Sequence, residues 1–164
     1  MMRPVSVTLG ARTFTFRSAT EEDVPALAGL LADDPIGATR ETPDELEAYL
    51  AAFRAVDADP AHLLVVAEDP DGTVAGTLQL TLVPGLSRAG ALRGQIEGVR
   101  VAATHRDAAL GSTLVRWATD EARVRGAALV QLTTDLRRVD ARRFYEGLGF
   151  VGSHLGMKRD LSAP

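Results

Sequence analysis

The sequence predicts a mixed α/β fold in which a central sheet is flanked by helices. Short runs alternate apolar and polar residues as strands do, and longer stretches repeat apolar residues at helical spacing. The segments follow in the order strand, helix, helix, three strands, helix, strand, helix and strand. The strand–helix–strand unit in the later part predicts a crossover connection.

Composition restricts the class of protein. The chain has 164 residues, which suits a single domain spanning residues 1–164 with a sizeable core. Hydrophobic residues make up 46% and charged residues 24%, an ordinary globular mixture that argues against disorder. The net charge of −4 gives no basic footprint for nucleic acid, and it leaves room for a cationic substrate.

The absence of cysteine excludes a thiol nucleophile, a disulfide framework and a thiolate metal site. It is compatible with a reducing compartment. No apolar run is long enough to span a bilayer, so we expect a cytoplasmic protein without a membrane partner. His62 and His154 are far apart and lack metal-ligand spacing, so we expect no metal.

The first elements are a short β segment and a helix. Residues 5–17 alternate around Gly10, which predicts either a hairpin or a broken first strand. A helix follows at 18–33, with Ser18 or Thr20 as its N-terminal cap and acidic residues in its first turn.

A second helix is predicted at 42–56, with Thr42 as cap and Pro43 in the first turn. Two strands at 62–68 and 73–83 flank the turn sequence DPDG and form a hairpin.

The second half of the chain alternates strands and helices. Both of its helices end before a glycine, Gly126 and Gly149, where a C-terminal glycine is favoured. The predicted elements are a strand at 94–102, a helix at 109–125, a strand at 128–134, a helix at 139–148 and a closing strand at 150–161.

A glycine in the sequence RDAALGST, Gly111, stands just inside a helix start, where it lowers helix stability by roughly 1 kcal/mol. A helix N-terminus has unpaired N–H groups and partial positive charge, and it therefore binds anions. Small residues at 108, 109 and 111 leave room for a phosphate, and Arg106 can add a charge-assisted hydrogen bond. The alternative is a small-residue helix start that packs closely on the sheet. Neither the Walker pattern nor the dinucleotide fingerprint is present.

Two motifs in this order resemble the GNAT superfamily of N-acetyltransferases. The phosphate-binding pattern Q/R-x-x-G-x-G/A reads RDAALG at 106–111, and the later pattern A-x-x-L/F-Y-x-x-x-G-F reads ARRFYEGLGF at 141–150. Ala109 replaces the first glycine of the loop; because alanine adopts helical geometry at little cost, we expect it at worst to weaken pyrophosphate access. Arg138 stands where many members have an asparagine that contacts the pantetheine arm, which puts that contact in doubt.

The resemblance implies a mostly antiparallel central sheet with helices on both faces and a splayed pair of strands. It also implies acetyl-CoA as the donor and direct attack by the amine of an acceptor, which we expect to be a small molecule. A homodimer is compatible with the apolar closing strand, since the family often dimerises. The residues that the resemblance assigns to the cofactor are Val99, Val101, Arg106, Asp107, Ala108, Ala109, Leu110, Gly111 and Ser112.

Tyr145 matches the family's usual general acid near the sulfur. A phenol has a reference pKa of about 10, so it is protonated at neutral pH and can donate to the leaving thiolate. The alternative role is an amphipathic tyrosine that packs on the sheet.

Glu97 lies in a predicted strand in which alternation places 97, 99 and 101 on one face. Partial burial there would raise the pKa of its carboxyl, which suits a base or an anchor for the substrate. The alternative is a salt bridge to Arg93 or Arg100.

Two other functions remain open at this level. A non-catalytic module that binds acyl-CoA would share the loop without needing Tyr145, and a purely structural α/β domain would bind no CoA. The family usually builds its acceptor wall from the first helices and their loop, so we expect residues 33–45 to determine the choice of acceptor.

Overall fold

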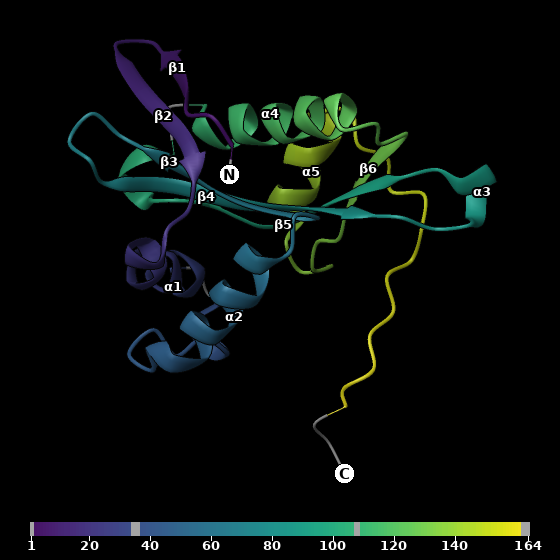
Figure 1. Cartoon of the computed structure of the whole chain (residues 1–164), viewed down its shortest axis with the longest axis horizontal. Coiled ribbons are helices and arrows are strands. Elements are labelled where there is room, and N and C mark those ends of the chain that lie inside the picture. The colour runs from purple at the N-terminus through teal and green to yellow at the C-terminus, as the bar shows by residue number, and fades with distance from the viewer. Residues whose placement is uncertain (1, 34–36, 107–108, 162–164) are drawn as a thin grey trace.

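The computed structural model describes residues 2–33, 37–106 and 109–161 and contains a single curled sheet (Figure 1). Its strands lie in chain order, and each neighbouring pair is antiparallel except β5 and β6, which are parallel. The expected mixed, mostly antiparallel sheet is confirmed. The strands are β1 (Val5–Leu9), β2 (Arg12–Ser18), β3 (His62–Glu68), β4 (Val74–Val83), β5 (Arg93–Val101) and β6 (Leu129–Leu132).

Helices cover both faces of the sheet, with α4 and α5 on one side and α1 and α2 on the other (Figure 1). Short 3-10 turns lie in the connections, among them η1 (Glu21–Asp23), η2 (Gly37–Thr39) and η3 (Ala103–His105). The α-helices are α1 (Val24–Ala32), α2 (Leu46–Ala58), α3 (Ser87–Gly90), α4 (Leu110–Val124) and α5 (Val139–Gly147). No helix among the described residues has the length and apolar character needed to cross a membrane.

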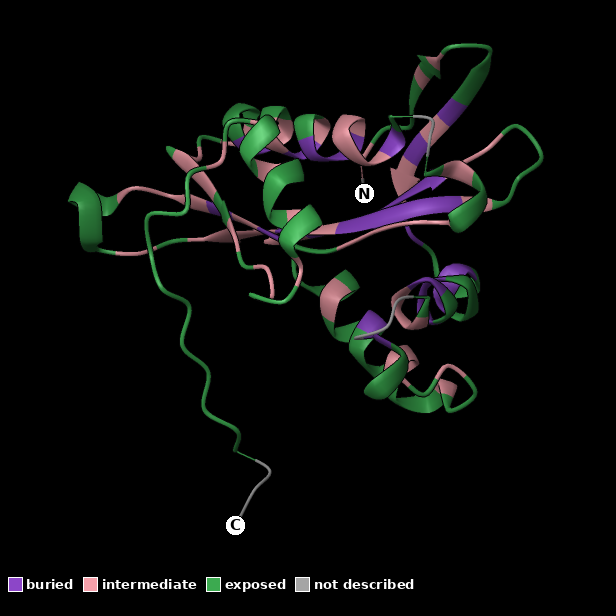
Figure 2. Ribbon diagram, turned by 180° about the vertical axis from the view of Figure 1, so that it is seen from behind, coloured by how far each residue is buried: buried purple, intermediate pink, exposed green. Residues whose placement is uncertain are grey.

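The larger core lies between the sheet and α4. Leu110, Leu114 and Ala118 of this helix are fully buried, as are Leu78 and Leu80 of the sheet (Figure 2). A smaller cluster lies between the sheet and the first two helices and includes the buried side chains of Val24, Leu27 and Phe53. Because each sheet face is apolar and covered, the edges of the sheet are where a ligand can meet the backbone.

Several predicted local features are confirmed. The first β segment is a hairpin, β1–β2, that turns at Gly10. Gly126 and Gly149 follow α4 and α5 with φ values of 87° and 89°, the left-handed conformation that terminates a helix.

The start of the second helix was predicted wrongly. It begins at Leu46 rather than at 42, and Thr42 is not its cap. The backbone N–H of Thr42 instead donates to the hydroxyl of Tyr49 at 3.0 Å, and that hydroxyl donates to Glu41 at 3.0 Å. The side chain of Tyr49 therefore holds the segment before α2 in a turn, and the helix does not extend into it.

The predicted closing strand at 150–161 is also wrong, because no strand forms there. After Phe150 the chain leaves the body as an extended segment (Figure 1). Val151, Leu155 and Met157 expose 81%, 76% and 87% of their surface. The apolar pattern suggested a strand, but a strand also needs a partner edge, and the neighbouring β6 is only four residues long.

Candidate active site

The end of β5 opens into a slot. β5 and β6 pair in parallel from Arg93 opposite Leu129 to Ile96 opposite Leu132, where β6 ends. β5 continues to Val101, so residues 97–101 have no β6 partner on that side. We call this open edge, together with the segment 133–138 opposite it, the β5–β6 slot. The expected splayed pair of strands is thus present, and it offers backbone groups to an extended ligand.

A β-bulge in β5 determines on which face of the sheet each side chain near the slot lies. Gln79 lies opposite Glu97 and Thr77 opposite Arg100, so Gly98 and Val99 together face one residue of β4. Gly98 has a φ of 61°, which a glycine adopts without strain.

The prediction that Glu97 shares a face with Val99 and Val101 is therefore wrong. Val101 lies opposite Gly76, where an added Cβ would meet Leu110 and Leu114 of α4, so the two valines face α4. Glu97 faces the α1 side and is exposed instead of partly buried. The same bulge brings Arg100 to the α1 side.

The turn into α4 begins with a strained residue. Ala109 has φ 55° and ψ 12°, the left-handed region, so it does not adopt the helical geometry expected of an alanine at this position. Its carbonyl oxygen accepts hydrogen bonds from the hydroxyls of Ser112 at 2.8 Å and Thr113 at 3.0 Å. Ser112 therefore bonds locally within the turn. Asp107 and Ala108, also predicted to bind the cofactor, lie outside the described residues.

Gly111 lets α4 approach β5 and α5 closely. A Cβ added there would lie 3.4 Å from Cγ2 of Val101 and 3.7 Å from Cζ of Phe144. A methyl group would fit these distances, but a larger side chain would enter the space between α4 and the strand. The adjacent Leu110 is fully buried and anchors the helix start in the core.

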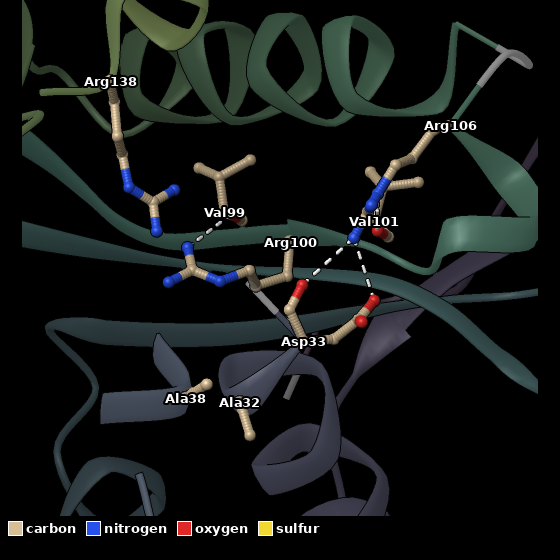
Figure 3. Close-up of a pocket in the computed structure, with 8 residues that line it drawn as sticks. All are labelled: Ala32, Asp33, Ala38, Val99, Arg100, Val101, Arg106 and Arg138. Atoms are coloured by element: carbon tan, nitrogen blue, oxygen red, sulfur yellow. Dashed lines mark hydrogen bonds and ion pairs between the residues drawn. The ribbon is translucent and has the colours of Figure 1, made fainter. Parts of the chain in front are cut away.

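Arg106 joins the loop to the end of α1. Its guanidinium donates to the carbonyl oxygen of Asp33 at 3.1 Å and to the Asp33 carboxylate at 2.9 Å, and its Nε donates to the carbonyl oxygen of Val101 at 3.3 Å (Figure 3). Arg106 therefore lies beside the cavity, and its role toward a phosphate stays a prediction. Asp33 was predicted only as the edge of the acceptor region, and nothing in the sequence indicated this pairing.

His105, next to Arg106 in the loop, contacts the β3–β4 hairpin and the core. Its Nε2 lies 3.4 Å from Oδ2 of Asp69, both side chains are only 10% exposed, and its ring packs edge-on against Phe14. The other carboxylate oxygen of Asp69 accepts the N–H groups of the β3–β4 turn, at residues 71 and 73. The residue before Arg106 is thus tied to the neighbouring hairpin.

A cavity of about 560 Å³ opens at the slot (Figure 3). It lies between the open edge of β5, the end of α1 and the N-terminus of α5. Its lining residues are Ala32, Asp33, Ala38, Val99, Arg100, Val101, Arg106 and Arg138. Apolar groups line part of the wall and charged groups converge on the rest, as is typical of small-molecule sites.

Tyr145 stands on α5 in a cluster of aromatic rings. Its ring packs edge-on against Phe144, with centroids 5.0 Å apart, and against Phe150, with centroids 5.9 Å apart. Burial raises the pKa of the phenol, while the positive charges of Arg100 and Arg138 act in the opposite direction and offset part of that rise. Its hydroxyl is therefore protonated at neutral pH and able to donate a proton.

Comparisons with known proteins agree with this geometry. A model of the acetyltransferase (GNAT) family matches residues 25–150. The aminoalkylphosphonate N-acetyltransferase of Salmonella typhimurium is 31% identical over 146 residues, which are 88% of this chain and 90% of that relative.

Solved structures show the same fold. A transcriptional regulator from Bacillus halodurans is 43% identical, with a TM-score of 0.86 over 90% of this chain and 99% of that one. A Clostridium acetobutylicum protein solved with acetyl-CoA is 17% identical, with a TM-score of 0.72 over 90% and 96% of the two chains. The chain therefore belongs to the GNAT family and is an N-acetyltransferase, an enzyme that transfers an acetyl group to an amine.

Proposed function

We propose that acetyl-CoA binds along the β5–β6 slot, with its pyrophosphate at the start of α4. The observation that carries this proposal is the open edge of β5, which is followed, after the η3 turn, by the first turn of the 15-residue helix α4. Backbone N–H groups in that turn and the helix dipole favour an anion. The acetyl-CoA bound to the fold relative from Clostridium supports the choice of donor.

The pantetheine arm would pair with the backbone at Val99 and Val101, whose side chains turn toward α4 and leave the strand edge free. When bound, acetyl-CoA supplies the thioester that the acceptor amine attacks. Arg106 is the cation next to the pyrophosphate position, and binding would require it to share or exchange its contact with Asp33.

In this proposal Tyr145 is the general acid. The amine nitrogen forms a bond to the acetyl carbon, the carbon–sulfur bond breaks, and the phenol proton passes to the departing thiolate. The phenolate then regains the proton that the attacking amine loses, by way of water or a base. The raised pKa of the partly buried phenol supports this role because it keeps the donor protonated until the thiolate forms.

Glu97 is proposed as the base or as an anchor for the amine. Its exposed carboxylate lies on the α1 side of β5, the side on which Ala32 and Asp33 border the cavity. From this position it can accept a proton from an ammonium group, directly or through one water molecule.

The acceptor is proposed to be a small molecule. A cavity of about 560 Å³ suits a compact amine, and the Salmonella relative, whose name specifies an aminoalkylphosphonate, supports this size class.

Calorimetric titration with acetyl-CoA tests the proposed binding site. The wild type should bind acetyl-CoA, Arg106→Ala should bind it more weakly, and Gly111→Trp should block it by filling the space beside Val101. Both variants need a thermal unfolding curve to show that they fold. Wild-type binding that neither change weakens would remove the α4 loop from the site.

Turnover in Tyr145→Phe tests whether this phenol is the general acid. If Tyr145 is the acid, the variant should lose turnover and still bind acetyl-CoA. Unchanged turnover would refute the assignment of Tyr145 as the acid.

A further inference from the structure

The first half of β5 presents a row of polar side chains on the α1 side of the sheet. Arg93, Gln95 and Glu97 lie on this face at every second position, before the bulge at Gly98. Glu97 is exposed, and the other two are partly buried. Figure 1 shows the β4–β5 hairpin extending past α1 and α2 toward α3, so this part of the face continues beyond both helices.

Arg93 is a partly buried cation that has no counter-ion among the described residues. Its Nε is buried without a hydrogen-bond partner in the protein. Its guanidinium lies beside the backbone of Gly85, where an added Cβ would be 3.5 Å from one of the terminal nitrogens. The sequence left an ion pair between Glu97 and Arg93 open, and the structure forms none. Because burying an uncompensated charge is costly, an anion supplied by a ligand is favoured at this position.

Glu97 carries the opposite charge at the other end of the row. Within the described part of the chain its carboxylate has no hydrogen bond or ion pair. Gln79 lies directly opposite on β4, but its Nε2 donates to Oγ1 of Thr81 at 3.3 Å and contacts Nδ1 of His62 at 3.2 Å. The donor group of Gln79 therefore does not serve Glu97, and the carboxylate can accept the hydrogen bonds of an ammonium group.

The spacing of the two charges specifies the length of a ligand that contacts both. Four residues of a strand span roughly 13 Å, and the guanidinium of Arg93 leans toward Gly85, away from Glu97. Each end of a bound ligand stops about 3 Å short of its partner, so its own charges are roughly 7–10 Å apart. One guanidinium fork matches the two oxygens of a carboxylate.

We propose that the acceptor is a linear amine whose far end carries a carboxylate, with its ammonium group at Glu97 and its carboxylate at Arg93. This inference rests on the proposed function, in which Glu97 receives the amine, and it specifies the class of substrate for the same site. Such a ligand compensates both charges, and its chain lies along β5 past Gln95. Arg93, which is outside the cavity lining, is then a residue that determines specificity.

Steady-state assays that follow CoA release compare three amines. The extended chain separates amine from carboxylate by roughly 10 Å in 8-aminooctanoate and by roughly 5 Å in 4-aminobutyrate. The third amine, 8-aminooctanamide, has the longer chain without the negative charge. The wild type should have a kcat/KM for 8-aminooctanoate at least about tenfold above the values for the other two. Calorimetric titration into the enzyme with CoA bound should rank the three ligands in the same way without turnover.

Three variants complete the test. Arg93→Gln should lower kcat/KM for 8-aminooctanoate by at least about tenfold and leave 8-aminooctanamide and the KM for acetyl-CoA nearly unchanged. Arg93→Lys keeps the charge without the planar fork and should retain part of the preference. Arg88→Gln is the matched control, since Arg88 is exposed at the tip of the same hairpin, and it should retain the preference in full. Thermal unfolding of each variant confirms that it folds.

Equal kcat/KM values for 8-aminooctanoate and its amide in the wild type would overturn the inference while leaving acetyl transfer intact. A preference that Arg93→Gln retains would also overturn it, because another cation would then hold the carboxylate. Failure of the proposed function has a different signature: acetyl-CoA would not bind in the calorimetric titration, no amine would be acetylated, and the inference would fall with it.

Discussion

Ala109→Gly should stabilise the protein, although glycine usually weakens a helix. Ala109 is the residue before α4 and has φ 55°, whereas the family's phosphate-binding pattern has a glycine at this position. A left-handed conformation costs an L-residue roughly 1–2 kcal/mol, and a glycine adopts it without that strain. The hydroxyls of Ser112 and Thr113, bonded to the Ala109 carbonyl, hold the turn in this geometry in either variant.

The gain is reduced by the unfolded chain. Glycine has more conformational freedom to lose on folding, which costs about 0.5–1 kcal/mol. The net stabilisation should therefore be about 0.5–1 kcal/mol. For a chain of this length that corresponds to an increase in Tm of roughly 1–4 °C.

Urea and thermal unfolding measure the effect, with Ala51→Gly as the matched control. Ala51 is exposed in the interior of α2, where the same substitution should destabilise by about 1 kcal/mol. The two changes should shift the urea midpoint in opposite directions with equal m-values. If Ala109→Gly destabilises the protein as Ala51→Gly does, Ala109 does not have the left-handed backbone conformation described here.

Three further predictions concern the ion pairs and the acid. Burial raises the pKa of the Asp23 carboxyl, but its bonds to Arg17 and Thr20 outweigh burial and lower the pKa overall, so Asp23→Asn should cost about 2–3 kcal/mol of stability at neutral pH. Because the pKa of Asp23 is lower in the folded state than in the unfolded state, the stability difference between the wild type and Asp23→Asn should shrink as the pH falls below about 4. The exposed control Glu21→Gln should change the free energy of unfolding little, and an equal loss of stability in the two variants would contradict the prediction. Tyr145→Phe should lower kcat by about 100-fold with little change in acetyl-CoA affinity, measured by steady-state kinetics and calorimetry; a loss confined to affinity would argue for packing alone. His105→Gln should weaken acetyl-CoA binding, and a double-mutant cycle with Asp69→Asn should show coupling, whereas additive effects would mean that the pair does not hold the loop.

Local patterns were enough to predict most elements of this fold. Apolar periodicity located α4 and the β3–β4 hairpin, and the glycines after α4 and α5 marked their ends. These features depend on neighbours a few residues apart, which a single sequence displays directly. The two motifs in the same way located the loop before α4, whose Arg106 lines the cavity, and Tyr145 on α5.

Features that depend on distant partners were missed or wrong. Strand alternation placed Glu97 with Val101, but the register of β5 against β4 inserts a bulge at Gly98 and turns Glu97 to the other face. The apolar closing segment had the pattern of a strand, but β6 ends after four residues and no pairing forms.

The sequence by itself determined the family, the order of the elements as far as α5, and the positions of the two family motifs. Only the tertiary structure decided the left-handed backbone conformation of Ala109, the bond from Arg106 to Asp33, and the place of Arg100 and Arg138 in the lining of one cavity. The physical reason is distance along the chain. A pattern records which face a residue takes within its own element, but a charged pocket is made by elements whose packing brings together residues far apart in the sequence.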